Sequence, residues 1–143
     1  MFERLALLIG TDNLNKIEEK TILIVGVGGV GGYVATSLAR SGVRNLIIMD
    51  FDTIDITNIN RQITAYSSTI GLKKVDVLEK MLLDINPNMN VIKYDTFLNS
   101  ENINVIFDRH KIDYIVDACY TINTKKDIIQ YGLTKYIPFI NSM

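Results

Sequence analysis

The chain has 143 residues, of which 48% are hydrophobic and 22% charged, which fits one compact domain of the α/β or α+β class better than two full domains. Its 15 basic and 16 acidic residues give a net charge of -1, too weak to hold nucleic acid by counterion release alone, although a local basic patch can still bind RNA. A single cysteine, Cys119, excludes an internal disulfide and a four-cysteine zinc site. No apolar run approaches the roughly 18 residues that span a bilayer, so we expect a cytoplasmic protein with no membrane segment.

Residues 1–20 are predicted to form a helical arm. Apolar residues recur there on both sides of a break at Gly10-Thr11-Asp12, namely Leu5, Leu7, Leu8, Leu14 and Ile17. A β-rich pattern begins at Thr21. We therefore expect two parts, the arm at residues 1–20 and one larger domain at residues 21–143.

Five β-rich runs follow the arm, and helical periodicity appears in three of the segments between them. The runs cover residues 21–26, 45–50, 90–95, 113–118 and 137–141, and the helical segments cover residues 30–41, 74–85 and 122–136. The first two runs are apolar at consecutive positions, which is typical of parallel strands covered on both faces. Strands that alternate with helices through right-handed crossovers predict an α/β fold, a Rossmann-like doubly wound and mainly parallel sheet.

A glycine-rich turn joins the first predicted strand to the first predicted helix after it. Gly26, Gly28 and Gly31 fit the pattern G-x-G-x-x-G, with Gly29 inside it. In that setting Gly26 allows a tight turn, Gly28 lets backbone amides approach a phosphate, and Gly31 lets helix and strand pack closely. Asp50 ends the second strand, nineteen positions after Gly31, where a carboxylate can bind both hydroxyls of a ribose. The phosphate of a dinucleotide or of ATP is expected here.

The residues after Asp50 separate these two ligands. A polar loop that includes Asp52 and Asn58 ends with Arg61, and Lys74 opens the next predicted helix. Arg61 can bind phosphate oxygens with its forked guanidinium and Lys74 can add a point charge, which suits a triphosphate whose pyrophosphate must leave. A nicotinamide-dependent oxidoreductase has no evident need for these cations. The set therefore favours ATP.

The same residues resemble a known family. The stretch from Gly26 to Asp50, with Asp52 and the runs at residues 58–62 and 71–74, resembles the ThiF/MoeB/HesA superfamily of carboxylate-adenylating enzymes, related to ubiquitin-activating enzymes. Residues 2–10, 57–62, 84–87 and 141–143 look most like the tRNA threonylcarbamoyladenosine dehydratases within it. The resemblance covers nearly the whole chain and implies that residues 21–143 form an ATP-binding domain. It also implies that ATP activates the carboxylate of a threonylcarbamoyl group on a tRNA adenosine, which then closes into a ring.

The resemblance assigns roles to individual residues. It implies that Gly28 and Gly29 lie against phosphate, that Asp50 holds the ribose, and that Arg61 and Lys74 bind the phosphates. Arg4 would reach the nucleotide of the neighbouring subunit in a homodimer. The full set expected around ATP and Mg²⁺ is Gly26, Gly28, Gly29, Gly31, Asp50, Asp52, Asn58, Arg61, Lys74, Asp117 and Tyr120. Other members of the superfamily imply an alternative, adenylation of a ubiquitin-like sulfur carrier with a sulfur-transfer partner protein.

Two departures from the family pattern bear on catalysis. The superfamily places an acid three residues after the position of Asp117, and this acid helps to coordinate magnesium, whereas this chain has Tyr120. A neutral phenol cannot replace a carboxylate as a hard magnesium ligand. The chain also ends at Met143, where the resembling enzymes continue, so we expect a fragment. Both departures keep open a second interpretation, a nucleotide-binding remnant without catalysis.

Two further features are interpreted as structural. Cys119 follows a predicted strand, where a nucleophile is conceivable, but the only histidine, His110, is distant in sequence, so a small buried thiol is expected. The pair Lys125-Lys126 is expected on a solvated helix surface rather than along a tRNA path.

Overall fold

A computed structural model describes residues 1–142, and it begins with two short helices, α1 (Glu3–Ile9) and α2 (Thr11–Glu18). Gly10 separates them with a positive φ of 85°, a conformation that glycine adopts without a Cβ clash. No residue of Glu3–Ile9 is buried, whereas Leu14 of α2 is 8% exposed. Among residues 1–142, none of the helices combines the length and the apolarity needed to cross a bilayer.

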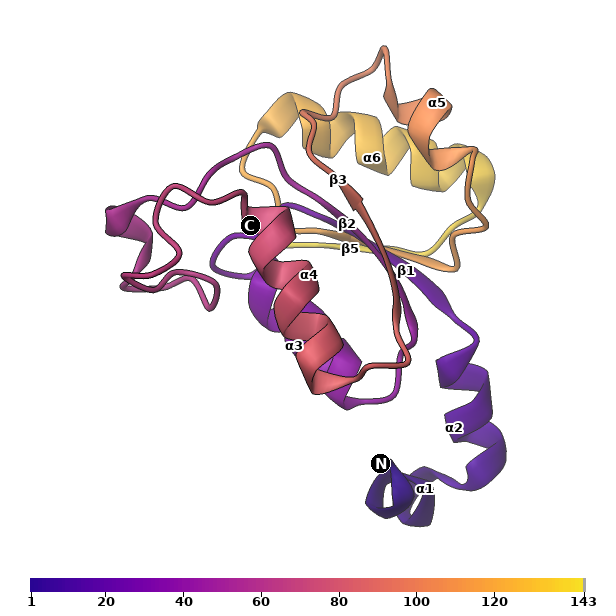
Figure 1. The fold of residues 1–143 in the computed structure, drawn as a ribbon. Helices are drawn as coiled ribbons and strands as arrows, with labels where there is room; N and C mark the ends of the chain where they lie inside the picture. Colours follow the sequence, from indigo (N-terminus) through magenta and orange to yellow (C-terminus); the bar gives the residue numbers. More distant parts are fainter. Residues whose placement is uncertain (143) are drawn as a thin grey trace.

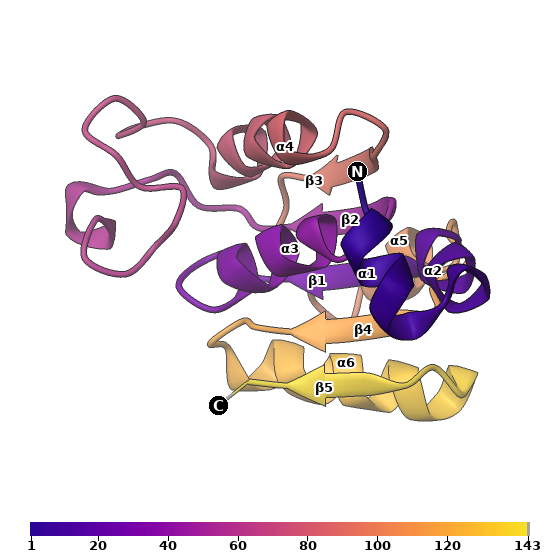
Figure 2. The same cartoon turned by 90° about the horizontal axis from the view of Figure 1, so that it is seen from below.

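Five parallel strands form one sheet in the order β3-β2-β1-β4-β5 (Figure 2). Their bounds are β1 (Thr21–Val25), β2 (Asn45–Met49), β3 (Asn90–Tyr94), β4 (Tyr114–Asp117) and β5 (Phe139–Asn141). The order reverses at β1, because β2 and β3 extend the sheet on one side and β4 and β5 on the other. The predicted Rossmann-like parallel sheet is confirmed, with strand ends one or two residues inside the predicted ranges.

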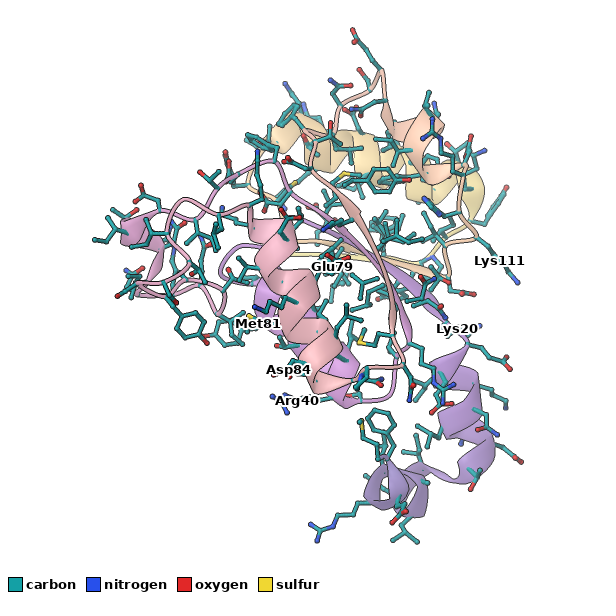
Figure 3. The ribbon with its side chains drawn as sticks, viewed as in Figure 1. Lys20, Arg40, Glu79, Met81, Asp84 and Lys111 are labelled. Carbon is teal, nitrogen blue, oxygen red and sulfur yellow. The ribbon has the colours of Figure 1, made fainter. Side chains whose placement is uncertain are left out.

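Helices cover both faces of the sheet (Figure 1). α3 (Gly31–Arg40) and α4 (Lys74–Ile85) pack on one face, where Ala35, Leu78 and Leu82 meet the side chains of β1 and β2. α5 (Ile103–Phe107) and α6 (Ile122–Lys135) pack on the other face, where Phe107 and Ile128 join a second apolar cluster. Charged side chains such as Arg40 and Asp84 lie on the outer surface of α3 and α4 (Figure 3). Burial on both faces explains why β1 and β2 are apolar at consecutive positions.

The sequence pattern missed α5 and placed the end of α6 one residue too late. α5 has five residues, too few for a helical period to be visible in the sequence. α6 stops at Lys135 because Tyr136 adopts a left-handed conformation, with φ 56° and ψ 37°, and its N–H bonds the carbonyl of Gly132. The chain then enters β5 after Pro138, which cannot donate a backbone hydrogen bond to the sheet.

A long loop between β2 and α4 extends past the carboxyl ends of the strands (Figures 1 and 2). Its only regular element is a 3₁₀ turn, η1 (Ile56–Asn58). The Asp55 carboxylate accepts a bond from the N–H of Thr57, and the Asn58 side chain accepts one from the N–H of Asp55. This reciprocal capping orders the loop and fixes Asn58, Arg61 and Gln62 beside the sheet.

Candidate functional site

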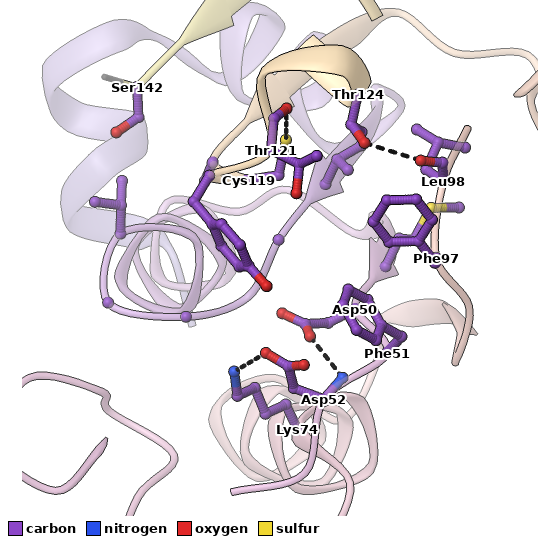
Figure 4. A pocket seen from close by; sticks show the side chains of 18 of the residues that line it. Asp50, Phe51, Asp52, Lys74, Phe97, Leu98, Cys119, Thr121, Thr124 and Ser142 are labelled. Atoms are coloured by element: carbon purple, nitrogen blue, oxygen red, sulfur yellow. Dashed lines mark hydrogen bonds and ion pairs between the residues drawn. The ribbon is translucent and has the colours of Figure 1, made fainter. Parts of the chain in front are cut away.

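A cavity of about 670 Å³ opens at the carboxyl ends of the central strands (Figure 4). In an open α/β sheet this is where ligands bind, at the point where the strand order reverses. The volume lies within the range of ligand pockets. The cavity lining includes most of the residues expected from the sequence, namely Gly26, Gly28, Gly29, Asp50, Asp52, Asn58, Arg61, Lys74 and Tyr120. Gly31, Asp117 and Arg4 are not among the lining residues.

The glycine turn leaves no room for side chains at two of its positions. Gly26 has a φ of 85°, and a Cβ there would lie 2.7 Å from the carbonyl oxygen of Ala118. A Cβ on Gly31 would collide with the carbonyl oxygen of Gly26, which is why Gly31 acts in packing and not in the cavity wall. Cβ atoms on Gly28 and Gly29 would meet only ordinary contacts, so at these positions the missing side chain leaves backbone open to a ligand.

Asp50 is held by the backbone at the end of β2. Its Oδ2 accepts a bond of 2.8 Å from the N–H of Val27, within the glycine turn, and its Oδ1 accepts one of 2.9 Å from the N–H of Asp52. Each oxygen keeps lone-pair capacity for a further donor, such as a hydroxyl group. The carboxylate is therefore oriented before any ligand binds.

Lys74 and Asp52 form an ion pair on the wall of the cavity. Nζ of Lys74 lies 2.7 Å from Oδ2 of Asp52, and the lysine side chain is only 7% exposed (Figure 4). Arg61 is exposed, and its Nη1 donates to the carbonyl of Thr57 and to Oδ1 of Asn60, each at 2.9 Å. Both cations keep further N–H donors available. The structure thus brings together the two cations that the sequence predicts for a triphosphate.

Lys125 lies in the cavity wall, whereas its sequence position predicts a solvated helix surface. Lys126 is exposed as expected, but Lys125 lines the cavity with a side chain that is 20% exposed. Its Nζ donates to Oδ2 of Asp117 at 3.2 Å and to the carbonyl of Ser142 at 2.7 Å. Its position in the first turn of α6, directly after the carboxyl end of β4, was the available signal, because that turn faces the cavity.

Asp117 lies beneath the cavity wall and does not line the cavity. It is fully buried, and besides Lys125 it accepts bonds from the backbone N–H and the thiol of Cys119. Cys119 itself is half-buried and lines the cavity, whereas a buried thiol was expected. Burial and then the Asp117 carboxylate raise the pKa of the Cys119 thiol to about 12. The thiol is therefore protonated at neutral pH, which excludes an activated nucleophile.

Two aromatic side chains on the cavity wall were not expected. Phe51 follows β2 and Phe97 follows β3, and their rings meet edge to face with centroids 5.2 Å apart. Thr124 anchors the segment after β3 through a bond of 2.9 Å to the carbonyl of Leu98 (Figure 4). The two rings give the cavity wall an apolar part, which is suited to an aromatic base. Only their positions in the sequence could have indicated this role, because both follow strands that end at the same edge of the sheet.

The two remaining expected residues lie apart from the cavity interior. Tyr120 reaches the cavity lining but is 78% exposed. Arg4 belongs to α1, which lies near the amino ends of the strands, away from the cavity (Figure 2). Arg4 therefore contributes nothing to the cavity of its own chain. No cluster of three or more histidine, cysteine or acidic side chains suited to a metal ion occurs within residues 1–142.

A parallel sheet with a glycine turn, a carboxylate at the end of β2 and two cations at its switch point is an arrangement typical of nucleotide-binding α/β proteins. The chain belongs to the ThiF family, whose pattern matches residues 2–143. It is 42% identical over 142 residues to a tRNA threonylcarbamoyladenosine dehydratase of Bacillus subtilis, and the match covers 99% of this chain and 56% of that protein. It is 34% identical over 117 residues to an adenylyltransferase and sulfurtransferase, MOCS3, of Culex quinquefasciatus, a match that covers 82% of this chain and 26% of that protein.

A solved structure supports the same relationship. The Escherichia coli tRNA threonylcarbamoyladenosine dehydratase TcdA, in complex with ATP, superposes with a TM-score of 0.94 at 32% identity. The match covers 98% of this chain and 57% of that one. The chain therefore spans little more than half the length of the two dehydratases and about a quarter of MOCS3.

Proposed function

We propose that this chain binds ATP in the cavity and supplies the nucleotide-binding part of an enzyme that adenylates a carboxylate. The observation that carries the proposal is the set of cations and glycines around one cavity, with Arg61 and Lys74 beside Gly28, Gly29 and Asp50. The ATP complex of the similar E. coli dehydratase supports ATP as the nucleotide. We take residues 1–20 as an arm and residues 21–143 as the ATP-binding domain.

The chain's own groups divide the work of binding. The backbone at Gly28 and Gly29 and the N-terminus of α3 are suited to phosphate oxygens. Asp50, oriented by Val27, is suited to the ribose hydroxyls. Arg61 and Lys74 are suited to the outer phosphates, whose charge must be neutralised as pyrophosphate leaves. Phe51 and Phe97 offer the apolar wall for the base.

Mg²⁺ enters the proposal with ATP. Magnesium in such sites is held by one or two carboxylates together with phosphate oxygens. Asp52 fits this role, because it lines the cavity, is 34% exposed and uses Oδ2 for Lys74. Asp117 does not fit, because it is fully buried and bonded to Lys125 and Cys119.

The full-length reaction that we propose is the cyclising dehydration of threonylcarbamoyladenosine on tRNA. A carboxylate oxygen of the substrate bonds to the α-phosphorus of ATP and pyrophosphate leaves. The carbamoyl part of the same threonylcarbamoyl group then attacks the activated carbonyl carbon and loses a proton, which closes the ring and displaces AMP. The name of the 42%-identical Bacillus subtilis relative supports this substrate. We place the protein in the cytoplasm, as a homodimer in which Arg4 reaches the partner's cavity. A sulfur-carrier protein is the alternative acceptor, supported by the relative that is both adenylyltransferase and sulfurtransferase.

Calorimetric titration of the purified protein with ATP and with NAD, with and without Mg²⁺, tests the nucleotide assignment. We expect ATP to bind and NAD to give no heat, because Arg61 and Lys74 match a triphosphate. Binding of NAD without any response to ATP would overturn the proposal.

Tyr120 favours one specific alternative, nucleotide binding without the chemical step. Its neutral, 78% exposed phenol stands where the superfamily pattern has an acid. We expect ATP binding to survive in this chain, since the glycine turn and Arg61 act without that acid. In a protein lengthened at its carboxyl end to the size of its relatives, Tyr120→Asp should raise magnesium-dependent pyrophosphate exchange. Full exchange with Tyr120 in place would contradict this alternative.

A further inference from the structure

Gln62 is the most buried polar side chain in the cavity wall that lacks a structural partner. The residue is 7% exposed and lines the cavity. Its Oε1 is buried and has no hydrogen-bond partner within residues 1–142. The main chain around it is well anchored, because its N–H donates to the carbonyl of Asn58 at 2.9 Å and its carbonyl accepts from the N–H of Ala65 at 3.0 Å. The side-chain position is thus imposed by an ordered loop.

The side-chain amide of Gln62 faces the glycine turn. Nε2 of Gln62 lies 3.6 Å from the point that a Cβ on Gly28 would occupy. Any side chain on Gly28 would therefore fill the space between the turn and this amide. Within residues 1–142 neither N–H of Nε2 donates to a protein acceptor, so a ligand in the cavity can accept from this amide, whereas Oε1 is an acceptor that a phosphate oxygen does not satisfy. An N–H donor beside a glycine turn is suited to an anionic oxygen.

Successive residues of the glycine turn contact different groups of the proposed ATP site, from the ribose end toward the outer phosphates. Val27 binds Asp50, the carboxylate assigned to the ribose. Gly28 comes next and faces Gln62, whereas a Cβ on Gly29 would lie 3.5 Å from Cγ of Arg61. Gln62 therefore lies nearer to the ribose end of the turn than Arg61 does.

We propose that Gln62 binds the phosphate nearest the ribose through an N–H of its side-chain amide, and so fixes the phosphate at which adenylation occurs. The inference rests on the proposed ATP function and adds a positioning residue to it. The inference predicts that these residues contribute differently to the binding of AMP and of ATP. Gln62 serves AMP and ATP alike, whereas Arg61 and Lys74 serve mainly the outer phosphates of ATP.

The test compares adenosine, AMP and ATP binding by calorimetry in the unmodified protein and in Gln62→Met. The variant keeps much of the side-chain volume and removes the amide. We expect the dissociation constants for AMP and ATP to rise by the same factor, about tenfold, since a hydrogen bond to a charged group is lost. Adenosine affinity should not change. Gln62→Glu, which presents a carboxylate to the phosphate, should weaken AMP and ATP further.

Thermal unfolding without nucleotide separates binding from a structural role. Gln62→Met removes an unpartnered buried oxygen, so its melting temperature should equal or exceed that of the unmodified protein. Thr64→Val is the matched control, because Thr64 is fully buried in the same loop, its Oγ1 also has no partner within residues 1–142, and it does not line the cavity. It should leave all three affinities unchanged.

Three outcomes overturn the inference. A lower melting temperature of Gln62→Met with a parallel loss of adenosine affinity would show a structural role. Unchanged affinity of Gln62→Met for AMP and ATP would show that Gln62 does not bind a phosphate, and would leave the proposed function intact. Failure of the unmodified protein to bind either nucleotide would overturn the proposed function and this inference with it.

Discussion

The Lys74–Asp52 pair shows how single residues prepare the cavity. The ammonium group is nearly buried, and burying a charge without a partner is costly, so the Asp52 carboxylate at 2.7 Å compensates this cost and holds the lysine side chain in place. The backbone adds to this arrangement, because the N–H of Lys74 donates to the carbonyl of Asp52 at 3.1 Å. A cation held in this way needs little reorganisation when a phosphate arrives, which is the condition for strong electrostatic stabilisation.

The two cations should distinguish ATP from AMP. We expect Arg61→Ala and Lys74→Ala each to weaken ATP by about 1.5 to 3 kcal/mol, and AMP by much less, because the lost bonds are to outer phosphates. Calorimetry with both nucleotides measures the difference. Lys73→Ala is the matched control, since Lys73 is the adjacent lysine, pairs with Asp95 and does not line the cavity. Equal losses for ATP and AMP would contradict the placement of Arg61 and Lys74.

Cys119 reports on occupancy of the cavity. Because its pKa is raised to about 12, the thiolate fraction at pH 7.5 is very small and increases with pH. We expect alkylation by iodoacetamide to be slow at pH 7.5, to accelerate as the pH rises to 10, and to be slowed at pH 10 by ATP. Mass spectrometry measures the modification, with the urea-unfolded chain as the reference for an unshifted thiol. Fast alkylation of the folded protein at neutral pH would contradict the shift.

At the level of elements, the junction of β1 and α3 depends on Gly31. A Cβ at this position would collide with the carbonyl oxygen of Gly26, and Gly26 already packs against the backbone of Ala118. Gly31→Ala is therefore expected to cost more than about 3 kcal/mol, because backbone must move. Urea unfolding measures the loss. Gly29→Ala is the control, since its Cβ would meet only ordinary contacts at 3.5 Å, and it should keep its stability. A stable Gly31→Ala variant would contradict the close packing of this turn.

The regular elements could be predicted where burial leaves a periodic pattern. Strands β1 and β2 lie between two helical layers, so each is apolar at every position after its first residue, and α4 shows the apolar spacing of one buried face. The cavity could be predicted only in part. Gly28 and Asp50 belong to a recurrent local pattern, whereas Phe97 and Lys125 enter the wall only because β3 and β4 end at the same edge. Such residues are adjacent through topology and not through sequence.

For the whole molecule, α1 is the part of the arm that the rest of the fold leaves largely uncovered. No residue of Glu3–Ile9 is buried, and Leu7 and Leu8 are 88% and 81% exposed. If the protein is a homodimer in which Arg4 reaches the partner, these leucines are suited to the contact between subunits.

Light scattering across a range of concentrations tests the arm. We expect a dimer for the unmodified protein and a monomer for Leu7→Glu/Leu8→Glu, with an unchanged circular-dichroism spectrum because neither leucine is in the core. Leu133→Glu, which adds a charge to an exposed position of α6, should remain dimeric. A monomer at every concentration of the unmodified protein would contradict the homodimer.

The pairing of β1 with β4 determines when the centre of the sheet can form during synthesis on the ribosome. Ile22 pairs with Tyr114, and Gly26 packs on Ala118, so the first strand of the sheet meets one neighbour about 90 positions later in the chain. At translation rates of roughly 5 to 20 residues per second, that delay is about 5 to 20 s. During this time the glycine turn lacks the wall that shapes it, and one edge of β1 stays open to other strands. A ligand of the cavity can therefore stabilise the nascent chain only after β4 and the start of α6 have emerged.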